Sequence, residues 1–231
     1  MPGWQHHRIR EIDLLIHTLR EQGIADERVL AAVREVPRDR FVSRNLTSSA
    51  WENHALPIEY GQTISQPYVV AAMTEALQLD GSELVLEIGT GSGYQSAILA
   101  HLAREVITIE RIEPLAGRAK AILTELGCTN VTVIVADGSE GWSGRAPYDA
   151  IIVTAGAPAP PPSLVAQLNR DGGRLVVPVG PDRGQYLIAI ERHGNAFTEA
   201  TIGPVAFVPL IGSEGWPTRG LPGPSNEPES R

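Results

Sequence analysis

The feature that most constrains this chain is a glycine-rich turn that follows a short apolar segment. Residues 84–88 (LVLEI) lead directly into residues 89–93 (GTGSG), which have glycine at three alternate positions. Glycine tolerates positive φ and exposes bare backbone, so such a turn between a strand and a helix can hold a ligand closely. A dinucleotide loop needs glycine where Tyr94 stands, and a Walker phosphate loop needs a Gly-Lys-Ser/Thr sequence that does not follow. The spacing therefore argues against both of these phosphate sites.

Short apolar segments alternate with segments of helical spacing through the middle of the chain. Helices are expected near 94–103, 114–126 and 162–169. Because Val-, Ile- and Leu-rich strands separated by helices form parallel sheets covered on both faces, we predict a doubly wound, Rossmann-like α/β fold. Two later strands have no helix-length insert between them, so they are predicted to be antiparallel at the sheet edge. The predicted strands are 84–88, 106–110, 131–136, 150–154 and 174–179 in the parallel part, then 186–191 and 204–210 at the edge.

Additional helices are predicted before this alternating part. Apolar residues over 9–19 recur at helical spacing, and Asp26 is placed to cap a second helix that Pro37 ends. A third helix begins at Pro67, a residue suited to the first turn. Residues 41–66 show no clean period, and long unpatterned segments inside compact domains often carry function.

Acidic residues stand at or after the ends of predicted strands, where open α/β sheets bind ligands. Glu110 ends the second strand, where its carboxylate can accept hydrogen bonds from both hydroxyls of a ribose. Asp137 and Gly138 follow the third strand and would meet an adenine amino group, while Glu87 would lie near a positively charged methionine moiety. A G-x-G-x-G turn after a strand with an acid matches the loop that binds S-adenosylmethionine, which has no pyrophosphate. These residues predict a class I S-adenosylmethionine-dependent methyltransferase fold, with Gly89 and Gly91 against the cofactor.

A chain of 231 residues suffices for one sizeable α/β core and is short for two. We therefore predict a single domain over 1–216. Within it, residues 1–66 would form the N-terminal helices and the substrate loop, 67–180 the cofactor-binding core, and 181–216 the edge strands. Residues 217–231 are rich in Pro, Gly, Ser and Glu, a composition that predicts a disordered tail.

Charge and composition argue against several other classes of protein. The formal net charge is −8 and Lys and Arg do not cluster, so nucleic acid is not expected as a partner. The six histidines and the single Cys128 lack metal-ligand spacing, so no metal is expected. The sequence has no apolar run of the roughly 18 residues that a membrane helix needs, and the N-terminus has no apolar signal-peptide core. A cytoplasmic location without membrane attachment is therefore expected.

One segment resembles a known family closely. The sequence YGQTISQPY at positions 60–68 is similar to the signature of the protein-L-isoaspartate O-methyltransferases. The resemblance runs from about 12 to 216. Further blocks carry it in the same order: REVPR at 34–38, LEIGTGSGY at 86–94, DG at 137–138, APYDAI at 146–151 and GGRLVVPVG at 172–180.

This resemblance implies a protein repair enzyme. Its substrates would be L-isoaspartyl residues in damaged proteins and peptides, whose free carboxylate receives the methyl group and leaves S-adenosyl-L-homocysteine. The ester then collapses to a succinimide that can reopen as normal aspartate. The resemblance assigns the active-site position to Ser65. We expect the protein to be a monomer. It also assigns cofactor contacts to Gln62, Thr63, Ile64, Ser92, Glu110, Asp137 and Gly138.

Some alternatives stay open at this point. Ser65 could serve only to cap the helix that begins at Pro67, or it could do this beside a catalytic role. The acceptor could be a small molecule or another protein group, since a fold does not determine the substrate. A non-catalytic cofactor-binding module is a third possibility. We expect the substrate groove between the Ser65 loop and the late edge strands, and we assign no ligand contact to residues 210–215.

Overall fold

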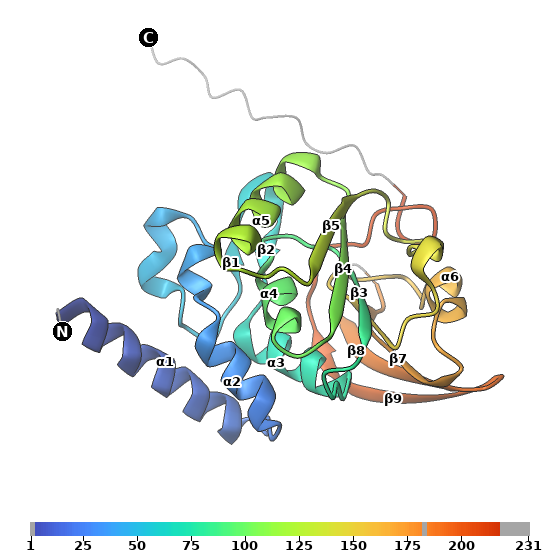
Figure 1. Cartoon of the computed structure of the whole chain (residues 1–231), viewed down its shortest axis with the longest axis horizontal. Coiled ribbons are helices and arrows are strands. Elements are labelled where there is room, and N and C mark those ends of the chain that lie inside the picture. The colour runs from blue at the N-terminus through green and yellow to red at the C-terminus, as the bar shows by residue number, and fades with distance from the viewer. Residues whose placement is uncertain (1–2, 182–183, 218–231) are drawn as a thin grey trace, which may run out of the picture.

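A seven-stranded sheet forms the centre of the computed structural model, which describes residues 3–181 and 184–217 (Figure 1). The strand order is β5-β4-β3-β6-β7-β8-β9. The first five of these pair in parallel, whereas β8 pairs antiparallel with both β7 and β9. The strands are β3 Leu84–Ile88, β4 Glu105–Glu110, β5 Val131–Val135, β6 Ala150–Val153, β7 Asp171–Val179, β8 Gln185–His193 and β9 Ala196–Val205.

Helices cover both faces of this sheet, as expected for a class I methyltransferase fold (Figure 1). One face packs against the N-terminal helices and α3 to α5, and the other packs against α6. Successive residues of the central strand alternate between the two faces: Val85 belongs to the first apolar cluster, and Leu84 and Leu86 to the second. The helices are α1 Gly3–Glu21, α2 Glu27–Glu35, α3 Pro67–Ala76, α4 Tyr94–Ala100, α5 Glu113–Glu125 and α6 Pro162–Ala166.

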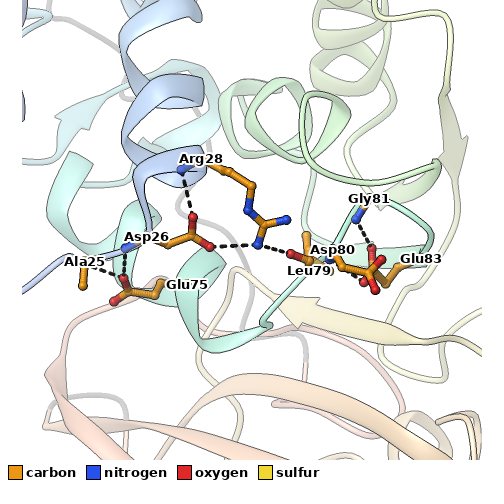
Figure 2. Close-up of polar contacts among 8 residues, drawn as sticks. All are labelled: Ala25, Asp26, Arg28, Glu75, Leu79, Asp80, Gly81 and Glu83. Carbon is orange, nitrogen blue, oxygen red and sulfur yellow. Dashed lines mark hydrogen bonds and ion pairs between the residues drawn. The ribbon is translucent and has the colours of Figure 1, made fainter.

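Carboxylates attach the N-terminal helices to the α/β part of the chain (Figure 2). Glu75 of α3 accepts hydrogen bonds from the backbone N–H groups of Ala25 and Asp26, at 2.7 and 2.6 Å. Asp26 caps α2 by accepting from the Arg28 N–H at 2.8 Å, as the sequence predicts. Burial alone would raise the pKa of Asp26, but its hydrogen bonds with Arg28 hold it below the usual value. Arg28 also donates to the Leu79 carbonyl, just before the turn that enters β3.

The segment between α2 and α3 is built from short elements. It contains 3-10 turns at Arg38–Arg40, Arg44–Ser49 and Glu59–Gly61. A small antiparallel hairpin joins β1 (Leu56–Pro57) to β2 (Thr63–Ile64). At the hairpin tip Tyr60 adopts a left-handed conformation (φ 60°), which is uncommon for a residue with a bulky side chain. No single helix or strand occupies this region, which agrees with its lack of a clean period.

The last predicted strand is wrong in position. Residues 204–210 were expected to form it, whereas β9 is Ala196–Val205 and follows β8 after a tight hairpin turn at Gly194 and Asn195. The reason is exposure: β9 is an edge strand whose side chains are exposed or half-buried, so it shows no run of apolar residues. The apolar residues after it belong to an irregular segment instead. The predicted disordered tail, apart from Pro217, lies outside the described residues.

Two features are absent from the described residues. Across 3–181 and 184–217, none of the helices has both the length and the apolar character needed to cross a bilayer. The same residues hold no group of three or more His, Cys, Asp or Glu side chains that could bind a metal ion.

Candidate active site

A cavity of about 850 Å³ opens at the carboxyl ends of β3, β4 and β6. This volume lies within the range of small-molecule sites, and the position is the switch point where open α/β sheets bind ligands. The wall is contributed by the β1–β2 hairpin, the glycine turn, the end of β4 and the segment after β9. Wall residues come from 60–65, 88–92, 94–95, 109–112, 154–155 and 208–211, together with Val70, Gly138, Trp216 and Pro217.

The glycine turn needs glycine because its neighbours leave no space. Gly89 has φ +97°, and a Cβ built there would lie 2.5 Å from the Thr154 hydroxyl oxygen. Gly93 has φ +89°, and its Cβ would lie 3.2 Å from the Cβ of Ala119 on α5. The Gly89 N–H donates to the Ile109 carbonyl at 2.8 Å, which joins the turn to the end of β4. The turn therefore presents its backbone to the cavity, where Gly89, Gly91 and Ser92 line the wall.

Glu110 is the acid that the structure brings into the cavity wall. Its Oε2 accepts a hydrogen bond from the Gly91 N–H at 3.0 Å, and its Oε1 accepts one from the Ile112 N–H at 2.9 Å. Only 7% of the residue is exposed. Each carboxylate oxygen keeps a further lone pair, so the group can accept two more hydrogen bonds from neighbouring hydroxyls. The carboxylate has a fixed orientation and can still accept hydrogen bonds, so it suits the two neighbouring hydroxyls of a ribose.

Asp137 lies beside the cavity, while its neighbour Gly138 lines the wall. The Asp137 carboxylate accepts hydrogen bonds from the N–H groups of Ser139, at 2.9 Å, and Ser213, at 3.1 Å. Burial alone would raise the pKa of Asp137, but these hydrogen bonds hold it below its usual value. A Cβ at Gly138 would lie 2.8 Å from Ile88, so a larger residue would displace the cavity floor. The predicted pair is therefore adjacent to the cavity, with only the glycine facing it.

Glu87 is not where the sequence places it. Its side chain is fully buried within β3 and does not belong to the cavity wall. The Ser96 hydroxyl of α4 donates to its Oε2, while Oε1 has no hydrogen-bond partner among the described residues. Burial raises the pKa of Glu87 to about 7, although the hydroxyls of Ser96 and Thr108 oppose the shift. We therefore remove Glu87 from the predicted cofactor contacts, because strand alternation turns it toward α4.

Ser65 lines the cavity beside the predicted contacts Gln62, Thr63 and Ile64. Within the described residues its hydroxyl makes no hydrogen bond. The start of α3 is capped from elsewhere: the Asn53 side chain accepts from the Tyr68 N–H at 3.0 Å. The helix start at Pro67 has no cap from the residue before it. A capping role for Ser65 is thus unsupported, and its hydroxyl is left available to a ligand.

The segment after β9 forms another wall of the cavity. The sequence predicted an edge strand at 204–210 beside the substrate groove but gave no ligand contact for 210–215, where Leu210 and Ile211 line the cavity. Trp216 also lines it, and its indole N–H donates to the Gly156 carbonyl at 3.1 Å. The sequence feature that could have indicated this wall is the apolar stretch at 207–211, which is too short and irregular for a strand. The sequence analysis also did not identify Thr154 as a site residue. Its hydroxyl donates to the Gly89 carbonyl at 2.5 Å and so stabilises the glycine turn.

Two kinds of polar group line this one cavity. Glu110, Gly138 and the glycine turn offer a carboxylate and bare backbone, a combination that suits a nucleoside. Ser65, directly after β2, offers a neutral hydroxyl. The cavity therefore has groups for a nucleoside cofactor and for a second reactant.

Comparisons with known proteins agree with this arrangement. Residues 10–215 match the model of the family described as Protein-L-isoaspartate(D-aspartate) O-methyltransferase (PCMT). The chain is 53% identical over 205 residues to a protein-L-isoaspartate O-methyltransferase of Photorhabdus laumondii, covering 89% of this chain and 98% of the relative. It is 50% identical over 215 residues to the Dictyoglomus thermophilum enzyme of the same name, covering 93% of this chain and 96% of that one.

Solved structures show the same fold. A protein-L-isoaspartate O-methyltransferase superposes with a TM-score of 0.80 at 28% identity, covering 88% of this chain and 67% of the solved one. A Plasmodium falciparum protein solved in complex with S-adenosyl-L-homocysteine superposes with a TM-score of 0.73 at 24% identity, covering 85% and 96%.

Proposed function

The chain belongs to the protein-L-isoaspartate(D-aspartate) O-methyltransferase family, and from this premise we propose how its cavity performs the reaction. The enzyme transfers the methyl group of S-adenosylmethionine to the free carboxylate of L-isoaspartyl residues in damaged proteins and peptides. One observation carries the proposal: the glycine turn with Glu110 and the hydroxyl of Ser65 line a single cavity. The alternatives of another acceptor or of a non-catalytic module are not favoured by relatives about 50% identical along most of the chain.

Glu110 and the glycine turn hold the cofactor in this proposal. The two free lone pairs of Glu110 accept from the ribose hydroxyls, and its bonds to Gly91 and Ile112 fix the carboxylate before the cofactor arrives. Gly138 allows the adenine ring to lie against the cavity floor, where a larger side chain would intrude. Asp137 stands next to it for the adenine amino group. Further contacts come from Gln62, Thr63, Ile64, Gly89 and Ser92.

The reaction needs orientation more than proton transfer. When bound, S-adenosylmethionine supplies a methyl group already activated on a positively charged sulfur. That methyl group would pass to a carboxylate oxygen of the acceptor, and the electron pair of the broken S–CH₃ bond would stay on sulfur. No proton moves, since the acceptor is already ionised at neutral pH. Ser65 donates a hydrogen bond that orients the carboxylate, and the apolar wall excludes water.

The acceptor enters between the hairpin and the segment after β9 in this proposal. Tyr60, at the exposed hairpin tip, and Ile211 line the cavity on these two sides. We assign residues 1–216 to one domain, with the substrate loop within 1–66. A cytoplasmic location and a monomeric state stay predictions, which cell fractionation and size-exclusion chromatography would test.

The decisive experiment uses the whole chain with S-adenosylmethionine labelled in its methyl group. Two peptides of identical sequence would be compared, one with L-isoaspartate and one with normal aspartate at the same position. We expect base-labile methyl ester on the isoaspartyl peptide and little on its partner. Transfer to neither peptide, or to both at equal rates, would contradict the proposed substrate.

A further inference from the structure

Arg38 is a fully buried arginine with an unusual set of partners. Across the described residues its guanidinium forms no ion pair with a carboxylate. It donates instead to backbone carbonyls: Nη2 reaches the oxygens of His54, at 3.1 Å, and Ser65, at 2.9 Å, and Nη1 reaches that of Ala50. One side chain thus joins three points of the segment between α2 and α3, and one of these points is the backbone of Ser65, the residue proposed to orient the methyl acceptor.

The same guanidinium also contacts the cofactor side of the site. Its central carbon lies 5.6 Å from the ring centroid of Tyr94, a cation–π arrangement. Tyr94 is fully buried, lines the cavity and begins α4 directly after the glycine turn. Phe41 also packs edge-on with this ring, and the two ring centroids are 5.6 Å apart. Arg38 therefore lies between the Ser65 backbone and the first residue that follows the glycine turn.

Simple packing does not explain an arginine at this position. A buried charge is costly unless hydrogen bonds and nearby dipoles replace its hydration, and an apolar side chain of similar size avoids that cost. Burial lowers the pKa of Arg38 only to about 10, so it stays charged at neutral pH. What arginine adds is a rigid planar fork that can hold several acceptors in fixed directions.

We propose that Arg38 is a positioning residue for methyl transfer. It holds the Ser65 backbone, and with it the Ser65 hydroxyl, at a fixed place relative to the glycine turn through its contact with Tyr94. Arg38 is not part of the cavity wall, so it acts through Ser65 and not on the reactants. A displacement of about 1 Å in such a group can lower the rate roughly 100-fold. This role rests on the proposed function, because it concerns the acceptor side of that reaction.

Arg38→Lys and Arg38→Met test the proposal, with Arg40→Met as the matched control. Arg40 lies two residues away, is exposed and pairs with Glu125, outside the cavity. The turnover number for the isoaspartyl peptide would be measured per cofactor-binding site, counted by titration with S-adenosyl-L-homocysteine, so that unfolded protein does not contribute. We expect both Arg38 variants to lose about tenfold or more in this number, with Lys losing less than Met, while cofactor affinity changes less than about threefold.

Hydrogen–deuterium exchange gives a second readout that needs no enzymatic activity. Wild type and Arg38→Lys would be compared in the segments 56–66 and 84–93. We expect faster exchange in 56–66 only, because the lysine cannot hold all three carbonyls. Arg38→Lys keeps the charge and most of the volume, so it decides the question if Arg38→Met does not fold.

The outcomes separate the two proposals. Wild-type protein that fails to methylate the isoaspartyl peptide would contradict the proposed function, whatever the variants do. Unchanged turnover per binding site in Arg38→Lys, with unchanged exchange in 56–66, would overturn the positioning role alone. A loss of cofactor affinity as large as the loss of turnover would also overturn it, since Arg38 would then organise the whole site.

Discussion

The Oε2 atom of Glu110 accepts a hydrogen bond of 3.0 Å from the backbone N–H of Gly91, which ties the acid at the end of β4 to the middle of the glycine turn. The second oxygen is fixed in the same way by Ile112 at 2.9 Å. The carboxylate therefore has its orientation before any ligand binds. This preorganisation reduces the ordering that cofactor binding requires.

Glu110→Ala should weaken cofactor binding. The change removes two charge-assisted hydrogen bonds to the ribose and leaves the Gly91 and Ile112 N–H groups without their acceptor. We expect a loss of roughly 1–3 kcal/mol in binding free energy, measured by titration calorimetry with S-adenosyl-L-homocysteine. Glu113→Ala is the control, since Glu113 is exposed in the first turn of α5 and does not line the cavity. Equal affinities for wild type and Glu110→Ala would remove Glu110 from the site.

Ser65→Ala should separate acceptor recognition from cofactor binding. The lost hydrogen bond to an ionised carboxylate is worth roughly 1.5–3 kcal/mol, so kcat/KM for the isoaspartyl peptide should fall about 10- to 150-fold. Cofactor affinity should stay close to that of wild type. Ser48→Ala is a matched control at an exposed position outside the cavity. An unchanged kcat/KM in Ser65→Ala would show that the hydroxyl does not contact the acceptor.

Asn53→Ala should lower the stability of the fold. Asn53 caps α3 by accepting from the Tyr68 N–H, and its side-chain amide also donates to Gln22 of the α1 region at 3.0 Å. Loss of a helix cap costs about 0.5–2 kcal/mol in free energy of unfolding. Urea unfolding would measure the change against Asn45→Ala, whose side chain accepts only from nearby Ser43. A stability equal to that of the control would mean that the helix start does not depend on Asn53.

The parallel part of the fold could be predicted because burial makes its strands uniform. The predicted strand 84–88 is confirmed as β3 without change, since every residue in it is buried between helices on both faces. The helix cap at Asp26 could also be predicted from the sequence, because its partner Arg28 lies two residues away. Secondary structure that depends on nearby partners or on burial of both strand faces can therefore be predicted from the sequence pattern.

Long-range contacts leave no such signature. The cap of α3 comes from Asn53, 15 residues before Tyr68, so the sequence suggested the adjacent Ser65 instead. Glu87 stands in the same motif as the glycine turn, yet only the register of β3 shows that it points toward Ser96. The wall after β9 depends on Trp216 reaching back to the Gly156 carbonyl, 60 residues earlier. These residues were misplaced or missed because their roles depend on tertiary neighbours.

Glu87 should make stability depend on pH, and Glu87→Gln should remove that dependence. Burial raises the pKa of the folded carboxyl to about 7, and the charge of Glu110 adds to the shift, whereas the unfolded value is near 4.5. The folded protein therefore binds more protons than the unfolded chain between these values. The free energy of unfolding must fall as pH rises through this window, because a buried carboxylate has to form.

A glutamine keeps the shape and a polar partner for Ser96 but never ionises. Relative to wild type, Glu87→Gln should gain stability progressively from pH 5 to pH 8, by at most roughly 3 kcal/mol. Urea unfolding at several pH values would measure this, with Glu199→Gln on the exposed strand β9 as control. A constant difference between wild type and Glu87→Gln across this range would show that Glu87 titrates at the same pH in the folded and unfolded states. A difference that grows only in Glu87→Gln would locate the buried proton at Glu87, in the strand that leads into the glycine turn.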